Sequence, residues 1–281
     1  MTFEELKYHF IKCLSHHYQL REINSFFNMI LFHIKKWNKI DFSLNKKELL
    51  NAKEKRFFDE KIMLLIEGNP IQYIIGEVLF YQLLIKINES VLIPRPETEE
   101  LVHLICENRS KKRFKNILDV GTGSGCIILA LKSIFYDTEC VGLDISKAAI
   151  KTAKKNSKLL NLDVEFLVDD IFNINIKTKF DVIVSNPPYI TLKEKSLMEN
   201  NVLDHEPHMA LFVDDYEPLI YYKAIAKFGI QSLTKKGEIY FEINEKYGDE
   251  VVYLLNDLGY QNCEIKKDLQ GKNRFVLAQL G

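Results

Sequence analysis

Apolar residues in the first quarter of the chain recur at the three- and four-residue intervals of amphipathic helices. Thr2 followed by Glu5 has the spacing of a capping box, and Ser43 stands where it can cap a later helix. A Gly-Asn-Pro run at 68–70 ends this pattern. We therefore predict a small helical bundle over residues 1–75. Its expected helices are 2–18, 21–37, 43–57 and 58–68.

Residues 76–93 change to the pattern of short strands. Two apolar runs flank Asn88-Glu89-Ser90, so we predict a β-hairpin linker that turns at these three residues. A pair of prolines then stiffens the entry to a helix, which is expected to begin at Glu97 or Thr98. The basic run at 109–115 is short and is expected on a solvated surface.

From Asn116 onward, strand and helix patterns alternate. The expected strands are 116–120, 139–144, 164–168, 180–185 and 238–243, and the expected helices are 124–135, 146–160, 217–234 and 247–259. Two final runs, 263–268 and 274–280, are expected to pair antiparallel. Such alternation is typical of a doubly wound sheet with helices on both faces. We therefore predict an α/β, Rossmann-like domain over residues 94–281, with a mostly parallel sheet and an antiparallel last strand.

Composition narrows the class of protein. The 281 residues are 47% hydrophobic, which is enough for a large core, and 38 basic residues balance 39 acidic ones to a net charge of −1. This balance provides no general attraction to nucleic acid or to an anionic membrane. Five separated cysteines without a CxxC pair predict neither a disulfide framework nor a zinc site. With no signal-peptide pattern and no membrane-spanning run, we expect a cytoplasmic monomer.

The first strand of the predicted sheet ends in DVGTGSG, at the start of a helix. Ligands of doubly wound sheets bind outside the carboxyl ends of the strands, and glycines let the backbone approach them closely. The second strand ends at Asp144, where a carboxylate can accept hydrogen bonds from both hydroxyls of a ribose. Together these features predict a cofactor that contains adenosine. The loop residues expected at this cofactor are Asp119, Gly121, Thr122, Gly123, Ser124 and Gly125.

Two classes of adenosine-containing cofactor are considered for this loop, dinucleotides and S-adenosylmethionine. The dinucleotide fingerprint GxGxxG/A needs a small third residue where Cys126 stands, so the sequence departs from it by one residue. The spacing D-x-G-x-G-x-G instead resembles motif I of the class I S-adenosylmethionine-dependent methyltransferases. The resemblance implies S-adenosyl-L-methionine, with further contacts from Ile145, from the Asp170 carboxylate to the adenine amine and from Ile171 to the ring. A local alternative for Asp169 and Asp170 is a helix cap.

The strand at 180–185 runs directly into the sequence NPPY. Two prolines fix φ and donate no N–H, so this segment is extended and stiff. In the methyltransferase class, the motif marks enzymes that methylate an NH₂ group conjugated to a π-system. We predict that the Asn186 side chain and the Pro187 carbonyl each accept one N–H, and that Tyr189 packs on the planar group. Asn186 is also expected to touch the cofactor.

Longer segments carry a more specific resemblance. GNPIQYIIGEVLFY, VLIPRPETEELV, EPHMALFV and GEIYFEI occur in the order found in the release factor glutamine N5-methyltransferases, PrmC/HemK, which the chain closely resembles from Gly68 onward. The resemblance implies methylation of the glutamine in the Gly-Gly-Gln motif of peptide chain release factors. The chain departs from the family at Asn244, where a glycine is usual. The implied substrate-binding residues are Asn186, Pro187, Pro188, Tyr189, Arg95 and Glu206.

Two other functions remain open at this stage. An N6-adenine methyltransferase acting on DNA or RNA shares the NPPY motif, but it is expected to carry a basic groove or a target-reading domain. A noncatalytic adenosine-binding module would not need the motif. The helical region 1–75 has no catalytic motif and is expected to dock the release factor. His205 and His208 flank a proline, so no metal site is expected, and their segment either lines the substrate entrance or forms a solvated loop.

Overall fold

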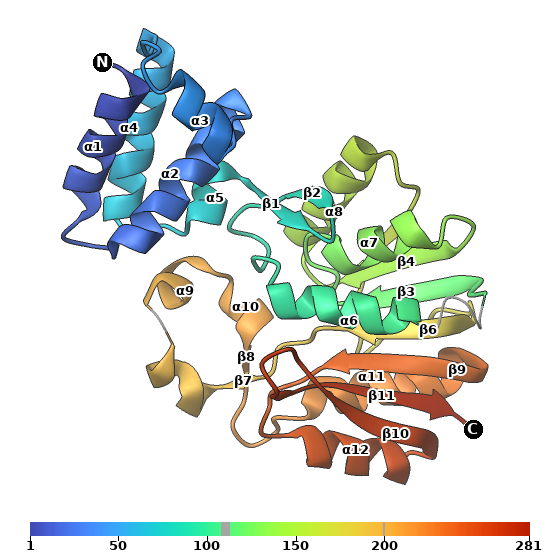
Figure 1. The fold of residues 1–281 in the computed structure, drawn as a ribbon. Coiled ribbons are helices and arrows are strands. Elements are labelled where there is room, and N and C mark those ends of the chain that lie inside the picture. Colours follow the sequence, from blue (N-terminus) through green and yellow to red (C-terminus); the bar gives the residue numbers. More distant parts are fainter. Residues whose placement is uncertain (108–112, 199) are drawn as a thin grey trace. The chain divides into compact units, whose positions relative to one another are not determined.

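The computed structural model describes residues 1–107, 113–198 and 200–281, which form two compact units (Figure 1). The first unit spans Met1–Gly76 and the second spans Glu77–Gly281. Most of the basic run predicted at 109–115 lies outside the described residues. No helix formed by the described residues is long and apolar enough to cross a membrane.

The first unit is helical, as predicted. Its helices are α1 (Phe3–Leu14), α2 (Leu20–Lys35), α3 (Lys39–Asn45), α4 (Ala52–Ile66) and α5 (Ile71–Ile75). The capping box at the start of α1 is confirmed, because Glu5 N donates to Thr2 Oγ1 (3.2 Å) and Thr2 N donates to the Glu5 carboxylate (2.9 Å). Rings of Phe10, Phe27 and Phe58 pack against one another in the core, so this unit has an apolar centre of its own.

The predicted boundaries between residues 39 and 66 are wrong. Ser43 caps no helix, since it lies inside α3 and its hydroxyl donates to Lys39 O. Asn38 and Asn51 are the caps, and each accepts two backbone N–H bonds in a capping box with an acid three residues later. Asparagine is a strong N-cap, and these two boxes therefore determine where α3 and α4 begin.

The second unit is built on a seven-stranded sheet with the order β10-β11-β9-β6-β3-β4-β5. Its strands are β3 (Asn116–Val120), β4 (Glu139–Asp144), β5 (Glu165–Val168), β6 (Phe180–Ser185), β9 (Leu233–Glu242), β10 (Tyr260–Lys267) and β11 (Asn273–Leu280). Among these strands, β11 alone runs against the others, since it pairs antiparallel with both β9 and β10. The predicted Rossmann-like sheet, mostly parallel with an antiparallel last strand, is confirmed.

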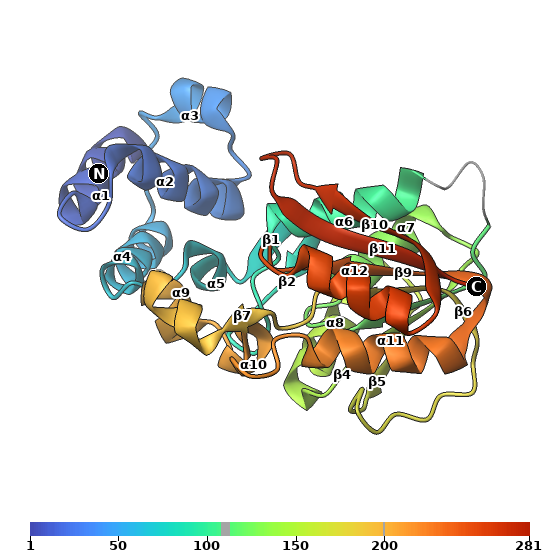
Figure 2. The same ribbon diagram turned by 90° about the horizontal axis from the view of Figure 1, so that it is seen from below.

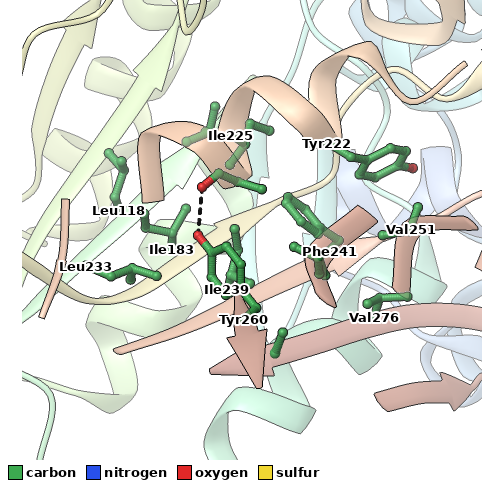
Figure 3. Packing of buried hydrophobic residues seen from close by; sticks show 14 of the residues in the cluster. Leu118, Ile183, Tyr222, Ile225, Leu233, Ile239, Phe241, Val251, Tyr260 and Val276 are labelled. Carbon is green, nitrogen blue, oxygen red and sulfur yellow. Dashed lines mark hydrogen bonds between the residues drawn. The ribbon is translucent and has the colours of Figure 1, made fainter. Parts of the chain in front are cut away.

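Helices cover both faces of this sheet. The long helices of the unit are α6 (Pro96–Glu107), α7 (Cys126–Ile134), α8 (Lys147–Leu160), α11 (Ile220–Ser232) and α12 (Gly248–Asp257). Helices α6 and α7 contact each other on one face, and α11 and α12 contact each other on the opposite face (Figure 2). Between the sheet and the helices α11 and α12, buried residues of both layers, such as Ile183, Phe241 and Val251, form the core (Figure 3). Tyr260 crosses this core and its hydroxyl donates to Ala226 O (2.8 Å).

The hairpin at the start of the unit turns earlier than predicted. Strands β1 (Glu77–Phe80) and β2 (Leu83–Lys86) are joined by Tyr81 and Gln82, both of which have positive φ. Asn88 lies beyond β2, where its side chain donates to Thr152 Oγ1 (3.0 Å). The prediction followed the turn-forming residues at 88–90, whereas the register of β1 with β2 imposes a two-residue turn on two residues that rarely adopt this conformation.

Several short elements were not predicted. They lie between β6 and α11 and comprise β7 (Ile190–Thr191), η2 (Leu192–Leu197), α9 (Asn200–His205), α10 (His208–Leu211) and β8 (Phe212–Val213). Strands β7 and β8 pair in parallel, which ties the residues after NPPY to the end of this segment. Their short length leaves no periodic pattern in the sequence.

Candidate active site

The candidate site forms where β3, β4 and β6 end side by side. In the sheet, Val120 is opposite Ser185 of β6 on one side and opposite Leu143 of β4 on the other. This register brings the glycine loop after β3, Asp144 at the end of β4 and Asn186 after β6 to one edge. The sequence predictions that involve these three segments therefore meet in one place.

The glycine loop has the backbone conformation that glycine favours. Gly121, Gly123 and Gly125 have φ of +73°, +56° and +81°. A side chain added at Gly121 would meet no heavy atom within 4 Å, and one at Gly123 would meet only the loop's own carbonyl at 4.0 Å. At Gly125, which caps α7, an added Cβ would lie 3.2 Å from Ala153 Cβ. The first two glycines therefore leave room for a ligand, and the third allows close helix packing.

Asp144 holds the glycine loop from the neighbouring strand. Its Oδ2 accepts a hydrogen bond from Gly123 N and its Oδ1 accepts one from Ser146 N, both at 2.8 Å. Burial raises the pKa of the Asp144 carboxyl, and the two backbone donors oppose this shift. Each oxygen keeps a further lone pair, so the carboxylate can accept two ribose hydroxyls in addition.

Asp119 lies beneath the loop and is fully buried. Thr122 Oγ1 donates to its Oδ2 (2.7 Å), whereas its Oδ1 has no partner among the described residues. Burial raises the pKa of Asp119 to about 7, and the nearby Asp144 carboxylate adds to the shift. Asp119 and Thr122 thus support the loop from below, and their direct contact with a cofactor stays a prediction.

Asn156 of α8 is a further support that sequence analysis missed. It is fully buried, and its Nδ2 donates to Ser124 O (2.9 Å) of the loop. The same amide forms hydrogen bonds with both the N–H and the carbonyl of Lys86 in β2. An asparagine within a lysine-rich helix carried no signal for this role, because the contact joins segments far apart in the sequence.

The residues expected around the adenine lie after β4 and β5. Ile145 is 55% exposed beside Asp144, which leaves it available to a ligand. Asp169 Oδ1 accepts from Asp170 N, and Asp170 Oδ1 accepts from Phe172 N, so both side chains stabilise a turn. The alternative role as a helix cap is wrong, because the described residues 169–179, between β5 and β6, form no helix. Ile171 packs against the core cluster, and its contact with adenine stays a prediction.

The NPPY segment presents two acceptors. Ser185 Oγ donates to Val120 O (2.6 Å), which ties the end of β6 to β3. Asn186 Nδ2 donates to Thr98 Oγ1 (3.2 Å). Neither Asn186 Oδ1 nor the Pro187 carbonyl accepts a hydrogen bond from the described residues. These are the two oxygens predicted to accept the substrate N–H groups, and Pro188 follows them half-buried.

Glu242, at the end of β9, is a second residue that sequence analysis did not assign. It is 1% exposed, and its two oxygens accept from Thr98 Oγ1 (2.7 Å) and Tyr189 OH (3.0 Å). Burial raises the pKa of Glu242, while these two donors and Arg274 oppose the shift. Burial and the Glu242 carboxylate together raise the pKa of Tyr189, so Tyr189 remains a neutral donor.

Arg95 and Glu206, both expected at the substrate, contact each other. The Arg95 guanidinium donates to one oxygen of the buried Glu206 carboxylate, and Ile93 N donates to the other (3.2 Å). This pair fastens the segment after α9 to the entry of α6. Any contact that they make with the substrate stays a prediction.

The histidines of this segment have separate environments. His208 Nε2 lies 2.8 Å from Leu203 O, and its ring packs edge-on against Phe212. No group of three His, Cys, Asp or Glu side chains that could hold a metal occurs among the described residues.

Asn244 replaces the glycine usual in the resembling family, and its backbone does not need positive φ. Its Nδ2 donates to Tyr189 O (3.2 Å) and to Glu194 Oε2 (3.0 Å), and its Oδ1 accepts from Lys246 N (3.1 Å). Asn244 therefore links this turn to the NPPY segment through its side chain.

Comparisons with known proteins identify methyltransferases as similar in sequence and fold. A family model described as "Methyltransferase domain" matches residues 111–260, and one described as "PrmC N-terminal domain" matches residues 9–76. The fold is similar to that of a methyltransferase from Pyrococcus furiosus (TM-score 0.54, 16% identity), over 79% of this chain and 99% of that one. It is also similar to the T. thermophilus 16S rRNA N2 G1207 methyltransferase (TM-score 0.54, 17% identity), over 73% of this chain and 50% of that one.

Fold and site together define a Rossmann-like methyltransferase. Release factor glutamine methyltransferases are similar over most of the chain. That of Flavobacterium psychrophilum is 38% identical and covers 98% of both chains, and that of Bacteroides thetaiotaomicron is 41% identical and covers 85% of this chain and 86% of its own. The chain belongs to the release factor glutamine methyltransferase family. Its cofactor is S-adenosyl-L-methionine, which the open glycine backbone and the Asp144 carboxylate fit.

Proposed function

We propose that this chain methylates the side-chain nitrogen, N5, of the glutamine in the Gly-Gly-Gln motif of peptide chain release factors. The observation that carries the proposal is the Asn186 amide. It stands at the strand end next to the glycine loop, with its oxygen unpaired and its nitrogen bound to Thr98. A primary amide substrate offers two N–H donors, which match the Asn186 and Pro187 oxygens.

The residues that would hold the cofactor lie on the loop side of the site. The glycine backbone at 121 and 123 leaves space for close approach, and Asp144 provides acceptors for the ribose. When bound, S-adenosyl-L-methionine supplies an electrophilic methyl group on a positively charged sulfur. Ile145, Asp170 and Ile171 belong to this proposal as the surroundings of the adenine.

The NPPY segment is proposed to overcome the weak nucleophilicity of an amide nitrogen. The lone pair of this nitrogen is delocalised into the carbonyl, so its direction has to be controlled. Two fixed acceptors, Asn186 Oδ1 and Pro187 O, orient both N–H bonds and stabilise positive charge as it develops. Orientation of this kind supplies roughly 7–11 kcal/mol in favourable cases. The alkylated nitrogen then releases its proton to water, and Tyr189 packs on the planar amide.

A methylation assay with labelled S-adenosyl-L-methionine tests the proposal. We expect the label to appear in an intact release factor and to be absent from a matched release factor in which the Gly-Gly-Gln glutamine is replaced by alanine. An adenine-rich DNA duplex and an RNA of the same sequence form the third arm. Label in either nucleic acid and none in the release factor would establish the adenine methyltransferase instead.

Residues 1–76 are proposed to dock the release factor. A free glutamine and a protein glutamine present the same amide, so the catalytic residues alone distinguish them poorly. The helical unit has a core of its own, carries no part of the candidate site and matches the N-terminal domain model of the family. A cytoplasmic location and a monomeric state also stay predictions.

A further inference from the structure

Behind Asn186, three hydrogen bonds run through two buried side chains. Asn186 Nδ2 donates to Thr98 Oγ1 (3.2 Å), and Thr98 Oγ1 donates to Glu242 Oε2 (2.7 Å). Tyr189 OH donates to the other oxygen, Glu242 Oε1 (3.0 Å). Thr98 is 3% exposed and Glu242 is 1% exposed, so the hydrogen bond between these two side chains is shielded from water. We call Thr98 and Glu242, with the bonds they make, the relay.

The hydrogen bonds of the relay have a fixed order of donor and acceptor. A threonine hydroxyl has one proton, and a carboxylate can only accept. Because the Thr98 proton goes to Glu242, the oxygen of Thr98 has only lone pairs left for Asn186. These lone pairs favour the NH₂ end of the amide and repel its oxygen end. A flipped Asn186 amide would leave two oxygens facing each other within a buried site, which is costly.

Glu242 must be ionised if both Thr98 and Tyr189 are to donate to it. A protonated carboxyl would donate through one oxygen, so either Thr98 or Tyr189 would lose its acceptor. Burial raises the pKa of Glu242, and the hydroxyls of Thr98 and Tyr189 and the Arg274 guanidinium oppose the shift by stabilising the charge. Arg274 is itself held by Asp268, to whose Oδ2 its Nε donates (3.1 Å).

We propose that Thr98 and Glu242 are positioning residues that present Asn186 Oδ1 to the substrate. Neither residue touches the reacting atoms. Thr98 binds the nitrogen end of the Asn186 amide, and Glu242 sets the direction of the Thr98 hydroxyl. This inference rests on the proposed function for its substrate, but the orientation of the amide is a property of the free protein.

Thr98→Val tests the relay in the full chain, because valine keeps the shape and removes the hydroxyl. We expect kcat on the release factor to fall roughly tenfold, in line with the loss of one hydrogen bond. The KM for the release factor and the affinity for S-adenosylhomocysteine should each stay within about twofold, because no substrate or cofactor contact is removed. Thr98→Ser restores the hydroxyl and should recover kcat to within about twofold of the original.

Thr138→Val is the matched control. Thr138 is also 3% exposed and its hydroxyl donates to Phe114 O (2.8 Å), away from the site. The Thr138→Val variant should lower the melting temperature as Thr98→Val does, and it should leave kcat unchanged. Equal loss of kcat in both valine variants, or no rescue by Thr98→Ser, would overturn the relay.

An NMR measurement separates the relay from the proposed function. The side-chain NH₂ signals of Asn186, assigned by their loss in Asn186→Ala, should shift and exchange faster in Thr98→Val and keep their positions in Thr98→Ser. Unchanged signals in Thr98→Val would refute the relay even in an active enzyme. If the unmodified chain methylates no release factor, the proposed function fails, and the NMR comparison still decides the orientation of the amide.

Discussion

Asn186 has two chemically different ends, and the site uses both. Its nitrogen donates to Thr98, and in the proposed mechanism its oxygen accepts from the substrate. An aspartate would keep the oxygens and lose the donor, and it would place a second carboxylate near the buried Glu242. The need for one donor and one neutral acceptor on the same side chain explains in physical terms why asparagine stands at position 186.

Asn186→Ala should abolish most turnover and leave the affinity for S-adenosylhomocysteine nearly unchanged. Removing one oriented acceptor at a reacting group typically costs roughly 2.7–4 kcal/mol of transition-state stabilisation, or about a hundred- to a thousandfold in kcat. Turnover assays and calorimetry separate the two effects. Asn256→Ala, on an exposed position of α12, is the control and should behave as the original chain. Near-normal turnover in Asn186→Ala would remove Asn186 from the mechanism.

Asp119→Asn should change how stability depends on pH. The folded chain holds a proton on Asp119 up to about pH 7, whereas an ordinary aspartate releases it near 3.8. The folded state therefore binds more protons between these values, and stability falls as pH rises through this range. Asparagine cannot titrate and keeps an acceptor for Thr122.

Melting temperatures of Asp119→Asn and of the original chain at pH 5, 6, 7 and 8 provide the check. The difference between them should grow in favour of Asp119→Asn from pH 5 to pH 7 and level off above. Parallel curves over the whole range would show that Asp119 titrates at its ordinary value.

At the scale of single residues, the sequence predicts which residues stand at strand ends. It does not predict which side chains hold them by hydrogen bonds. The glycines, Asp144 and Asn186 follow buried strands directly, so topology alone brings them together. Thr98 lies 144 residues from Glu242 and 88 from Asn186, and no local pattern connects positions so far apart.

At the scale of elements, the buried parallel strands are the easiest to predict. They are continuous apolar runs bounded by polar residues, so β3, β4 and β6 were predicted to the residue. Turns and short elements were predicted poorly, because tertiary contacts decide them. Tyr81 and Gln82 form a turn through strand register, and α5 and η2 are too short to carry a period.

Gly229 in α11 provides a test of packing between elements. A Cβ at this position would lie 2.3 Å from the Tyr260 hydroxyl, which donates to Ala226 O (Figure 3). Gly229→Ala should therefore destabilise the second unit by about 1–3 kcal/mol through overpacking, although alanine favours helix. Denaturant unfolding measures this loss, and Gln231→Ala, exposed on the same helix, should change stability by less than about 0.5 kcal/mol. A stabilised Gly229→Ala variant would contradict the predicted clash.

At the scale of the whole molecule, the two units have separate cores, and the candidate site belongs to the second. Deleting residues 1–76 should leave a folded chain that binds S-adenosylhomocysteine. Its activity on an intact release factor should fall far more than its activity on a short Gly-Gly-Gln peptide, because docking contacts are lost and the catalytic residues remain. Methylation kinetics of the truncated and the full chain, measured on both substrates, test this difference. Equal losses on the two would contradict docking.

The position of β11 determines the order in which the sheet can be completed during synthesis. β11 lies between β9 and β10, although both are made before it. Until residues 273–280 leave the ribosome, β9 has an unpaired edge and β10 has no partner in the sheet. Unpaired edges are sites of aggregation, so the nascent chain is vulnerable up to its last strand. Phe275 then pairs with Glu242, so the strand that carries the carboxylate behind Asn186 gains its second neighbouring strand only at that moment.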